Sequence, residues 1–112
     1  MKLRYTLEAI SDLQSIRYYI KSSLHNPQAA QRISKMILDQ CATLKRFPES
    51  GVSLGALTGH ETDVRMLVCD HYLALYRVDT DTISVARIIN ARQDYMRILL
   101  HGIELPQKEE RR

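Results

Sequence analysis

The turn at Asn26-Pro27 is the feature that most limits how this chain can fold, because it separates two helical patterns by only a few residues. Asn is a preferred helix N-cap and Pro is tolerated at the first helical position, so a new helix is expected to begin here. Apolar residues recur at helical spacing over residues 7–24 and again from the turn to about residue 46. Helices joined by so short a turn must lie nearly antiparallel. The sequence therefore predicts a helical hairpin that needs another apolar surface to cover.

Each predicted helix carries one apolar stripe that would face this surface. The stripes are Ala9, Leu13, Ile16 and Ile20 in the first helix and Ile33, Ile37, Cys41 and Leu44 in the second. Thr6 is the expected N-cap of the first helix, and Pro48 ends the second.

After the hairpin, the hydrophobic pattern changes from helical spacing to alternation. Residues 48–59 contain three glycines without a periodic apolar pattern, which predicts a loop. Residues 62–69, 72–78 and 83–91 are rich in Val, Ile, Leu and Tyr, and their short connections permit only antiparallel pairing. Residues 2–6 offer an additional edge strand, and residues 93–101 are expected to form a short helix that Gly102 ends. The predicted fold class is α+β, with the hairpin packed on a three- to four-stranded antiparallel sheet.

The length and composition are those of one folded domain. The chain has 112 residues, of which 45% are hydrophobic and 26% charged, so it is neither disordered nor large enough for two domains. We expect residues 1–102 to form the domain and residues 103–112 to form a polar tail. The first ten residues include Lys2, Arg4 and Glu8 and hold no continuous apolar run. A cytoplasmic protein without a membrane segment is therefore expected.

The cysteines, the histidines and the net charge indicate which cofactors and partners the chain can be expected to bind. The two cysteines, Cys41 and Cys69, lie among apolar neighbours without a CxxC partner, so buried free thiols are expected. The four histidines show no metal-ligand spacing, and neither a metal nor another cofactor is expected. A net charge of +3 favours an acidic partner, either nucleic acid or protein.

Four segments in order resemble motifs of the RelE/ParE toxin superfamily, and the resemblance covers about residues 2–100. The segments are residues 47–51 (FPESG), 64–67 (VRML), 70–79 (DHYLALYRVD) and 86–95 (ARIINARQDY). The resemblance implies the toxin of a type II toxin–antitoxin pair, which a cognate antitoxin protein holds inactive.

Within the superfamily the chain is more similar to the ParE branch, which blocks DNA gyrase, than to the RelE branch, which cuts mRNA on the ribosome. Two departures from the RelE pattern favour this reading. Tyr95 follows Arg92 by three positions, with Ile98 where a more distant tyrosine would be expected, and Asn90 stands where a histidine is common. A gyrase inhibitor is the leading interpretation, a ribosome-dependent mRNA endoribonuclease is the alternative, and an interaction module without toxicity is the third.

The candidate site residues follow from both readings. RNA cleavage would need a base, an acid and cations together, and Arg65, Arg92 and Tyr95 are its conditional catalytic candidates. For target binding the candidates are Arg65, Arg77, Arg87 and Arg92. Alternation predicts that Arg65 lies on the sheet face away from the helices. Arg77 and Arg87 lie in phase with apolar residues, so they either reach solvent or form structural bridges with Asp79, Asp81 or Asp94.

The predicted antitoxin contacts are on the first helix. Leu7 and Tyr18 lie opposite its apolar stripe, and Tyr19 lies on its flank. Such residues are either ordinary surface packing or aromatic anchors for a bound antitoxin segment.

Overall fold

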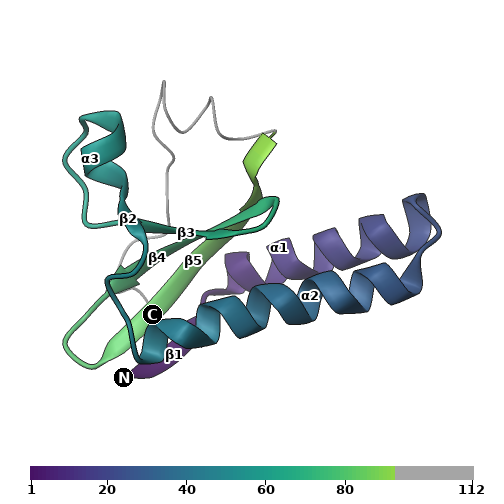
Figure 1. Cartoon of the computed structure of the whole chain (residues 1–112), viewed down its shortest axis with the longest axis horizontal. Helices are drawn as coiled ribbons and strands as arrows, with labels where there is room; N and C mark the ends of the chain where they lie inside the picture. The colour runs from purple at the N-terminus through teal and green to yellow at the C-terminus, as the bar shows by residue number, and fades with distance from the viewer. Residues whose placement is uncertain (93–112) are drawn as a thin grey trace.

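A helical hairpin packs against one face of a five-stranded sheet in the computed structural model, which describes residues 1–92 (Figure 1). The elements in chain order are β1 (Lys2–Tyr5), α1 (Leu7–Tyr18), the π-helical turn η1 (Tyr19–Ser23), α2 (Pro27–Ala42), the 3-10 turn η2 (Thr43–Lys45), β2 (Val52–Ser53), α3 (Leu54–Thr58), β3 (Arg65–Cys69), β4 (Tyr72–Val78) and β5 (Thr82–Asn90). The predicted α+β class is confirmed. The predicted helix at residues 93–101 and the tail at residues 103–112 lie outside the described residues.

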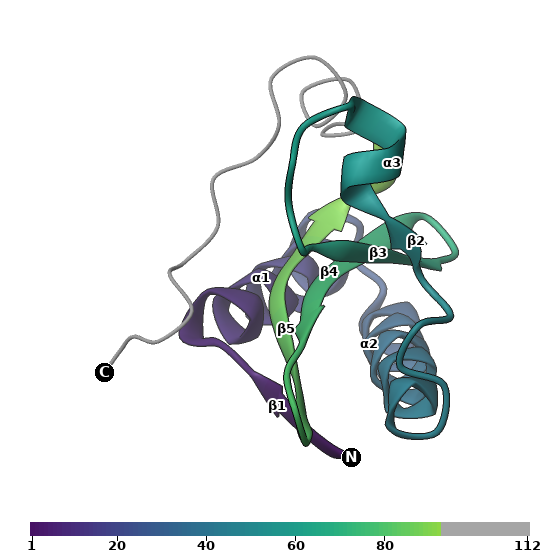
Figure 2. The same ribbon diagram turned by 90° about the vertical axis from the view of Figure 1, so that its left-hand side faces the viewer.

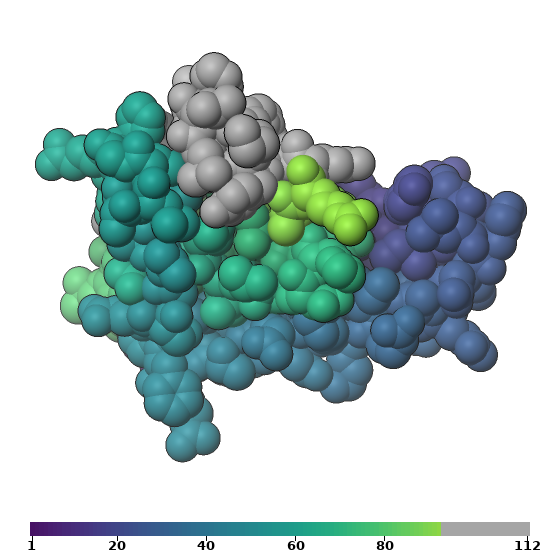
Figure 3. Space-filling model, turned by 45° about the horizontal axis from the view of Figure 1, so that its top comes forward, coloured from purple at the N-terminus to yellow at the C-terminus, as the bar shows by residue number. Residues whose placement is uncertain are grey.

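The hairpin forms from the local signals that the sequence carries. The Thr6 hydroxyl accepts a hydrogen bond from the Ala9 N–H at 3.1 Å, and the Asn26 side chain accepts one from the Ala29 N–H at 3.0 Å. Both predicted N-caps are therefore confirmed. His25 turns the chain with a φ of 52°, a left-handed conformation that shortens the connection. The turn end of the hairpin projects past the strands (Figures 1 and 3), and Ile20, Ala29 and Ala30 form a small core there.

The sheet has the strand order β1-β5-β4-β3-β2, which differs from the predicted antiparallel sheet of three or four strands. β1 pairs with β5 in parallel, from Lys2 opposite Thr82 to Tyr5 opposite Val85, while the other pairs are antiparallel. Parallel pairing is possible here because the helical hairpin and most of the sheet separate β1 from β5 along the chain, so no short turn forces the two strands to run antiparallel.

The predicted loop at residues 48–59 contains two short elements, β2 and α3. Ser53 caps α3 by accepting a hydrogen bond from the Ala56 N–H at 3.4 Å, and Gly59 ends it with a φ of 78°. Elements of two and five residues are too short to produce a periodic apolar pattern, which is why the sequence indicated only a loop. In Figure 2, α3 stands over the β2–β3 end of the sheet, away from α1 and α2.

Both faces of the sheet are apolar. The face toward the hairpin forms the main core with α1 and α2; its buried members are Ala9, Ile37, Cys41, Leu44, Cys69, Ala74, Tyr76, Ile83, Val85 and Ile88. The opposite face holds a second cluster of Leu54, Val64, Met66, Leu73, Leu75 and Ile89. Both cysteines are free and buried, as predicted. None of the helices within residues 1–92 is both long and apolar enough to cross a bilayer.

Candidate functional site

Arg87, one of the four predicted target-binding arginines, is tied to α1. Its Nε and Nη2 donate to the two carboxylate oxygens of Asp12 at 2.7 and 3.0 Å, and Asp12 also accepts from the Ile88 N–H at 2.9 Å. A register shift in the β4–β5 pairing precedes this point, so that Arg87 is opposite Leu75. Arg87 therefore forms a structural bridge, which is one of the two roles considered for it from the sequence, with Asp12 on α1 as a partner. Sequence reasoning missed Asp12, whose one signal is its position a helical turn from Ala9 on the apolar stripe.

Hydrogen bonds from Thr6 and Asp12 continue along the edge of β5 beyond the end of β1. The Thr6 N–H donates to the Val85 carbonyl at 3.0 Å, and the Thr6 hydroxyl donates to the Ala86 carbonyl at 2.8 Å. Together with the Asp12 contact to Ile88, these bonds satisfy backbone groups that an unpaired strand edge would leave exposed. The start of α1 is thus fixed along β5 by side chains of its first turns.

Arg77 also has a carboxylate partner. It lies in phase with Leu73 and Leu75, whose side chains belong to the cluster on the face away from the hairpin. Its Nε donates to Asp63 at 3.0 Å, and this ion pair links β4 to the segment before β3. The bridging role considered from the sequence is present, with Asp63 as a partner.

Arg65 lies on the opposite face from the one predicted. It pairs with Tyr76 across β3 and β4, and Leu67 and Cys69, in phase with it, pack in the main core beneath the hairpin. The prediction that it faces away from the helices is wrong. Val64 and Met66 do share a face, but that face has an apolar cluster of its own, so alternation could not identify which side the helices cover.

Arg65 and Tyr76 together hold the segment that resembles the FPxxG motif. Arg65 Nη2 donates to the Glu49 and Gly51 carbonyls at 3.0 and 2.7 Å. The Tyr76 hydroxyl donates to the Pro48 carbonyl at 2.8 Å and accepts from the Gly51 N–H at 3.0 Å. A Cβ at Gly51 would lie 2.7 Å from that hydroxyl, which explains the glycine. Within residues 1–92 no carboxylate pairs with Arg65, and its buried Nε has no hydrogen-bond partner.

Arg92 is exposed at the end of the described chain, and its backbone N–H donates to the Asn90 side chain at 2.9 Å. Asn90 pairs with Tyr72 at one end of β4, while Arg65 pairs with Tyr76 toward the other end. The structure therefore does not bring the predicted arginines into one constellation. Tyr95 lies outside the described residues. No cluster of three or more His, Cys, Asp or Glu side chains suited to a metal occurs in the described part of the chain.

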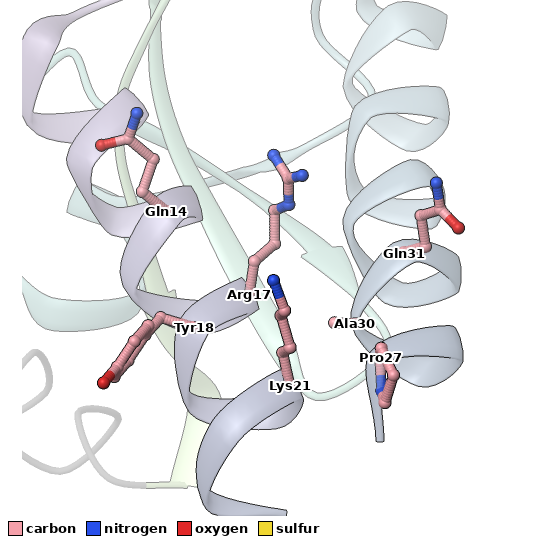
Figure 4. A pocket seen from close by; sticks show the side chains of 7 residues that line it. All are labelled: Gln14, Arg17, Tyr18, Lys21, Pro27, Ala30 and Gln31. Atoms are coloured by element: carbon pink, nitrogen blue, oxygen red, sulfur yellow. The ribbon is translucent and has the colours of Figure 1, made fainter. Parts of the chain in front are cut away.

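A basic groove that the sequence did not indicate lies between α1 and α2. It has a volume of about 390 Å³ and is lined by Gln14, Arg17, Tyr18, Lys21, Pro27, Ala30 and Gln31. Arg17 and Lys21 project into the gap between the helices, while Tyr18 projects from the other side of α1 (Figure 4). The lining contains two cations and no carboxylate, so the groove favours an acidic ligand.

The predicted antitoxin contacts divide into two places. Leu7 and Tyr18 are 81% and 70% exposed and lie on one side of α1, with the exposed Ile10 between them. Tyr19 is also exposed but lies near Tyr72. Burial raises the pKa of Tyr72, and the neighbouring Tyr19 and Asp70 raise it further. Of the stripe of Leu7, Ile10 and Tyr18, only Tyr18 also lines the basic groove, so apolar and cationic contacts adjoin at this residue.

Comparisons with known proteins agree with this architecture. The family model described as "ParE toxin of type II toxin-antitoxin system, parDE" matches residues 3–95. A solved chain from the "Chromosomal ParDE TA system from P. aeruginosa" is similar in fold, with a TM-score of 0.67 and 26% sequence identity over 80% of this chain and 95% of that chain. No curated protein matches. Because the family model extends from the first strand to beyond the last, the chain belongs to the ParE toxin family of type II toxin–antitoxin systems.

Proposed function

We propose that this ParE-family chain inhibits DNA gyrase in the cytoplasm by binding it, without catalysis, and that a cognate antitoxin neutralises it. The toxin domain in this proposal comprises residues 1–102. The observation that carries the non-catalytic reading is the dispersal of the arginines. Arg77 and Arg87 are engaged by Asp63 and Asp12, and Arg65 and Arg92 lie toward different ends of the sheet.

Ribonuclease chemistry needs an acid, a base and phosphate-binding cations around one bond. Among residues 1–92, His60 is exposed after α3, and His71 is exposed in the β3–β4 turn beside Asp70. Neither imidazole is held near two arginines by any contact in the described chain. This arrangement supports an inhibitor that works through a binding surface.

The proposed target contacts are Arg65 and Arg92. Arg65 is held by neutral carbonyls, so its charge is not neutralised by its partners, and Arg92 is exposed. Arg77 and Arg87 contribute by holding the sheet to its neighbours, because carboxylates already partner them.

The proposed antitoxin site is the Leu7–Tyr18 side of α1 together with the groove beside α2. Tyr18 offers an aromatic anchor, and Arg17 and Lys21 offer charge to an acidic antitoxin segment. Tyr19 contributes a further contact near Tyr72. Binding there covers apolar surface that is exposed in the isolated toxin.

A supercoiling assay with purified gyrase and relaxed plasmid tests the target. The wild-type chain is expected to inhibit supercoiling, and equimolar antitoxin is expected to restore it. Arg92→Ala should weaken inhibition about tenfold, equivalent to roughly 1.4 kcal/mol of binding, since an interface arginine often contributes this much. Arg32→Ala, which removes an exposed arginine from α2, is the matched control and should inhibit normally.

The ribonuclease alternative predicts a different outcome for mRNA and for supercoiling. If the toxin cuts mRNA on translating ribosomes, transcript ends mapped after induction will be phased with codons, and supercoiling will proceed unchanged. Such a result would exclude gyrase as the target. If neither supercoiling nor mRNA is affected, the chain acts as an interaction module without toxicity.

A further inference from the structure

Phe47 is an exposed aromatic side chain at the point where the chain passes from α2 toward β2 (Figure 1). It is 60% exposed, although phenylalanine is among the residues most often buried. It follows the end of α2, whereas the α2 residues that line the basic groove belong to the first turns of that helix. Neither the proposed antitoxin site nor the proposed target contacts include it. Because single exposed apolar side chains are common, its exposure alone does not indicate a site.

The backbone beneath Phe47 is irregular, yet hydrogen bonds hold it firmly. The Phe47 N–H donates to the Thr43 carbonyl at 3.0 Å, and the Phe47 carbonyl accepts from the Ser50 N–H at 3.1 Å. The hydroxyl of the fully buried Tyr76 and the guanidinium of Arg65 hold the residues that follow. A side chain on a fixed backbone requires little ordering when it binds, which is a property of an interface anchor.

Cationic side chains surround this aromatic ring. The Arg46 guanidinium carbon lies 5.8 Å from the centroid of the Phe47 ring, a cation–π contact, and the exposed Lys45 precedes Arg46. Arg65 adds a charge that its carbonyl partners do not neutralise. Glu49 is the one acidic residue among positions 45–51. The surplus of positive charge favours a partner surface that is acidic.

We propose that Phe47 is the anchor through which this toxin binds its target, and that the target offers an apolar pocket with an acidic rim. This inference rests on the proposed function, because it places DNA gyrase at the Phe47 end of the hairpin. Phe47 enters the pocket, Arg46 and Lys45 pair with carboxylates of the rim, and Arg65 is a positioning residue for the segment. Aromatic and arginine side chains contribute much of the binding free energy in protein interfaces.

The observations favour a protein partner over a nucleic acid. A basic surface with an aromatic side chain can also stack on the bases of a single strand. Here, however, the Arg46 guanidinium lies over the Phe47 ring, so one ring face is not free for a base. The exposed Glu49 carboxylate in the same segment would also repel a phosphate backbone. The patch therefore fits a pocket on a protein better than a strand of nucleic acid.

Binding of the full chain to immobilised DNA gyrase without DNA, measured by biolayer interferometry, tests the proposal. Phe47→Ala should weaken binding at least about tenfold, the loss expected of an anchor residue, and should weaken supercoiling inhibition equally. Its urea denaturation midpoint should match the wild type, because the side chain is exposed and the backbone hydrogen bonds remain. Leu24→Ala is the matched control, because Leu24 is 55% exposed at the turn end of the hairpin, and it should bind like the wild type.

The outcomes separate this inference from the proposed function. If the wild type binds gyrase and Phe47→Ala binds equally well, this inference alone is wrong. If the wild type does not bind gyrase, the proposed function and this inference both fail. A fluorescent single-stranded oligonucleotide supplies the nucleic-acid test. If Phe47→Ala loses affinity for the oligonucleotide and keeps its affinity for gyrase, the anchor belongs to nucleic acid and the proposal is overturned.

Charge reversal at Arg46 tests the acidic rim. Arg46→Glu should bind gyrase more weakly and associate more slowly than Arg46→Ala, because it places a carboxylate against the carboxylates of the rim. Glu49→Gln should bind at least as tightly as the wild type, since it removes a charge of the wrong sign. Wild-type affinity for Arg46→Glu would show that the rim is not acidic.

Discussion

At the scale of single residues, Asp12 joins α1 to β5 through both a side chain and a backbone N–H. Its carboxylate binds the Arg87 guanidinium through two hydrogen bonds and accepts the Ile88 N–H at the edge of β5. The Asp12 side chain is only 17% exposed and that of Arg87 is 29% exposed, so water replaces these bonds poorly. Asp12→Ala should lower the free energy of unfolding by about 2–3 kcal/mol, because the partly buried Arg87 guanidinium loses two charge-assisted hydrogen bonds and the Ile88 N–H loses the bond that Asp12 accepts. Urea denaturation measures this loss.

The Lys35–Asp39 pair on α2 supplies the control. Its side chains are 76% and 63% exposed, and a surface pair of this kind contributes less than about 1 kcal/mol, so Asp39→Ala should change stability little. A double-mutant cycle of Asp12→Ala and Arg87→Ala should show strong coupling. If Arg87→Ala abolishes gyrase inhibition without loss of stability, Arg87 is a target contact rather than a structural one.

At the scale of elements, the hairpin combines an exposed apolar stripe with a basic groove. Tyr18 is 70% exposed on the stripe and also borders the groove. Tyr18→Ala should weaken antitoxin binding by about 1–3 kcal/mol, which is typical of an aromatic anchor in an interface. The isolated fold should be unaffected, because the side chain does not belong to the core. Calorimetric titration of the toxin with its antitoxin measures the effect.

Phe47→Ala is the matched variant for this titration. Phe47 is another exposed aromatic side chain, 60% exposed after η2, where it stacks against Arg46. Its removal should leave antitoxin affinity unchanged. Equal losses for the two variants would indicate a site elsewhere on the surface, and unchanged affinity for both would move the antitoxin off this side of α1.

At the scale of the whole molecule, β1 joins the N-terminus to the last described strand. It pairs with β5 over four residues, and Leu3 and Tyr5 pack against the main core. Removal of residues 1–5 should therefore cost about 2–3 kcal/mol from the burial of these two half-buried side chains, equivalent to roughly 10 °C in Tm for a domain of this size. It would also expose the β5 edge, which favours association between chains.

Circular dichroism melting and size-exclusion chromatography measure both effects of that deletion. Lys2→Ala changes an exposed residue of the same strand and should melt like the wild type. A truncated chain that remains monomeric and melts cooperatively near the wild-type temperature would contradict the assigned role of β1.

The sequence by itself determined the features that depend on near neighbours along the chain. The caps at Thr6 and Asn26 and the apolar spacing of the hairpin were predicted correctly, because each reflects hydrogen bonds or burial within a few residues. The ordered motifs identified the ParE family for the same reason, since they are read along the chain.

The contacts between residues far apart in the sequence were decided only by the tertiary structure, because they depend on which strands and helices become neighbours. The parallel pairing of β1 with β5 brings Asp12 to Arg87, and no spacing rule relates residues so far apart. The sheet face on which Arg65 lies could not be predicted, because both faces of β3 are apolar. Alternation separates the residues into two faces but does not indicate which face the helices cover. The groove of Arg17 and Lys21 exists only because the hairpin closes beside them, and Cys41 and Cys69 share the main core only because α2 packs on β3.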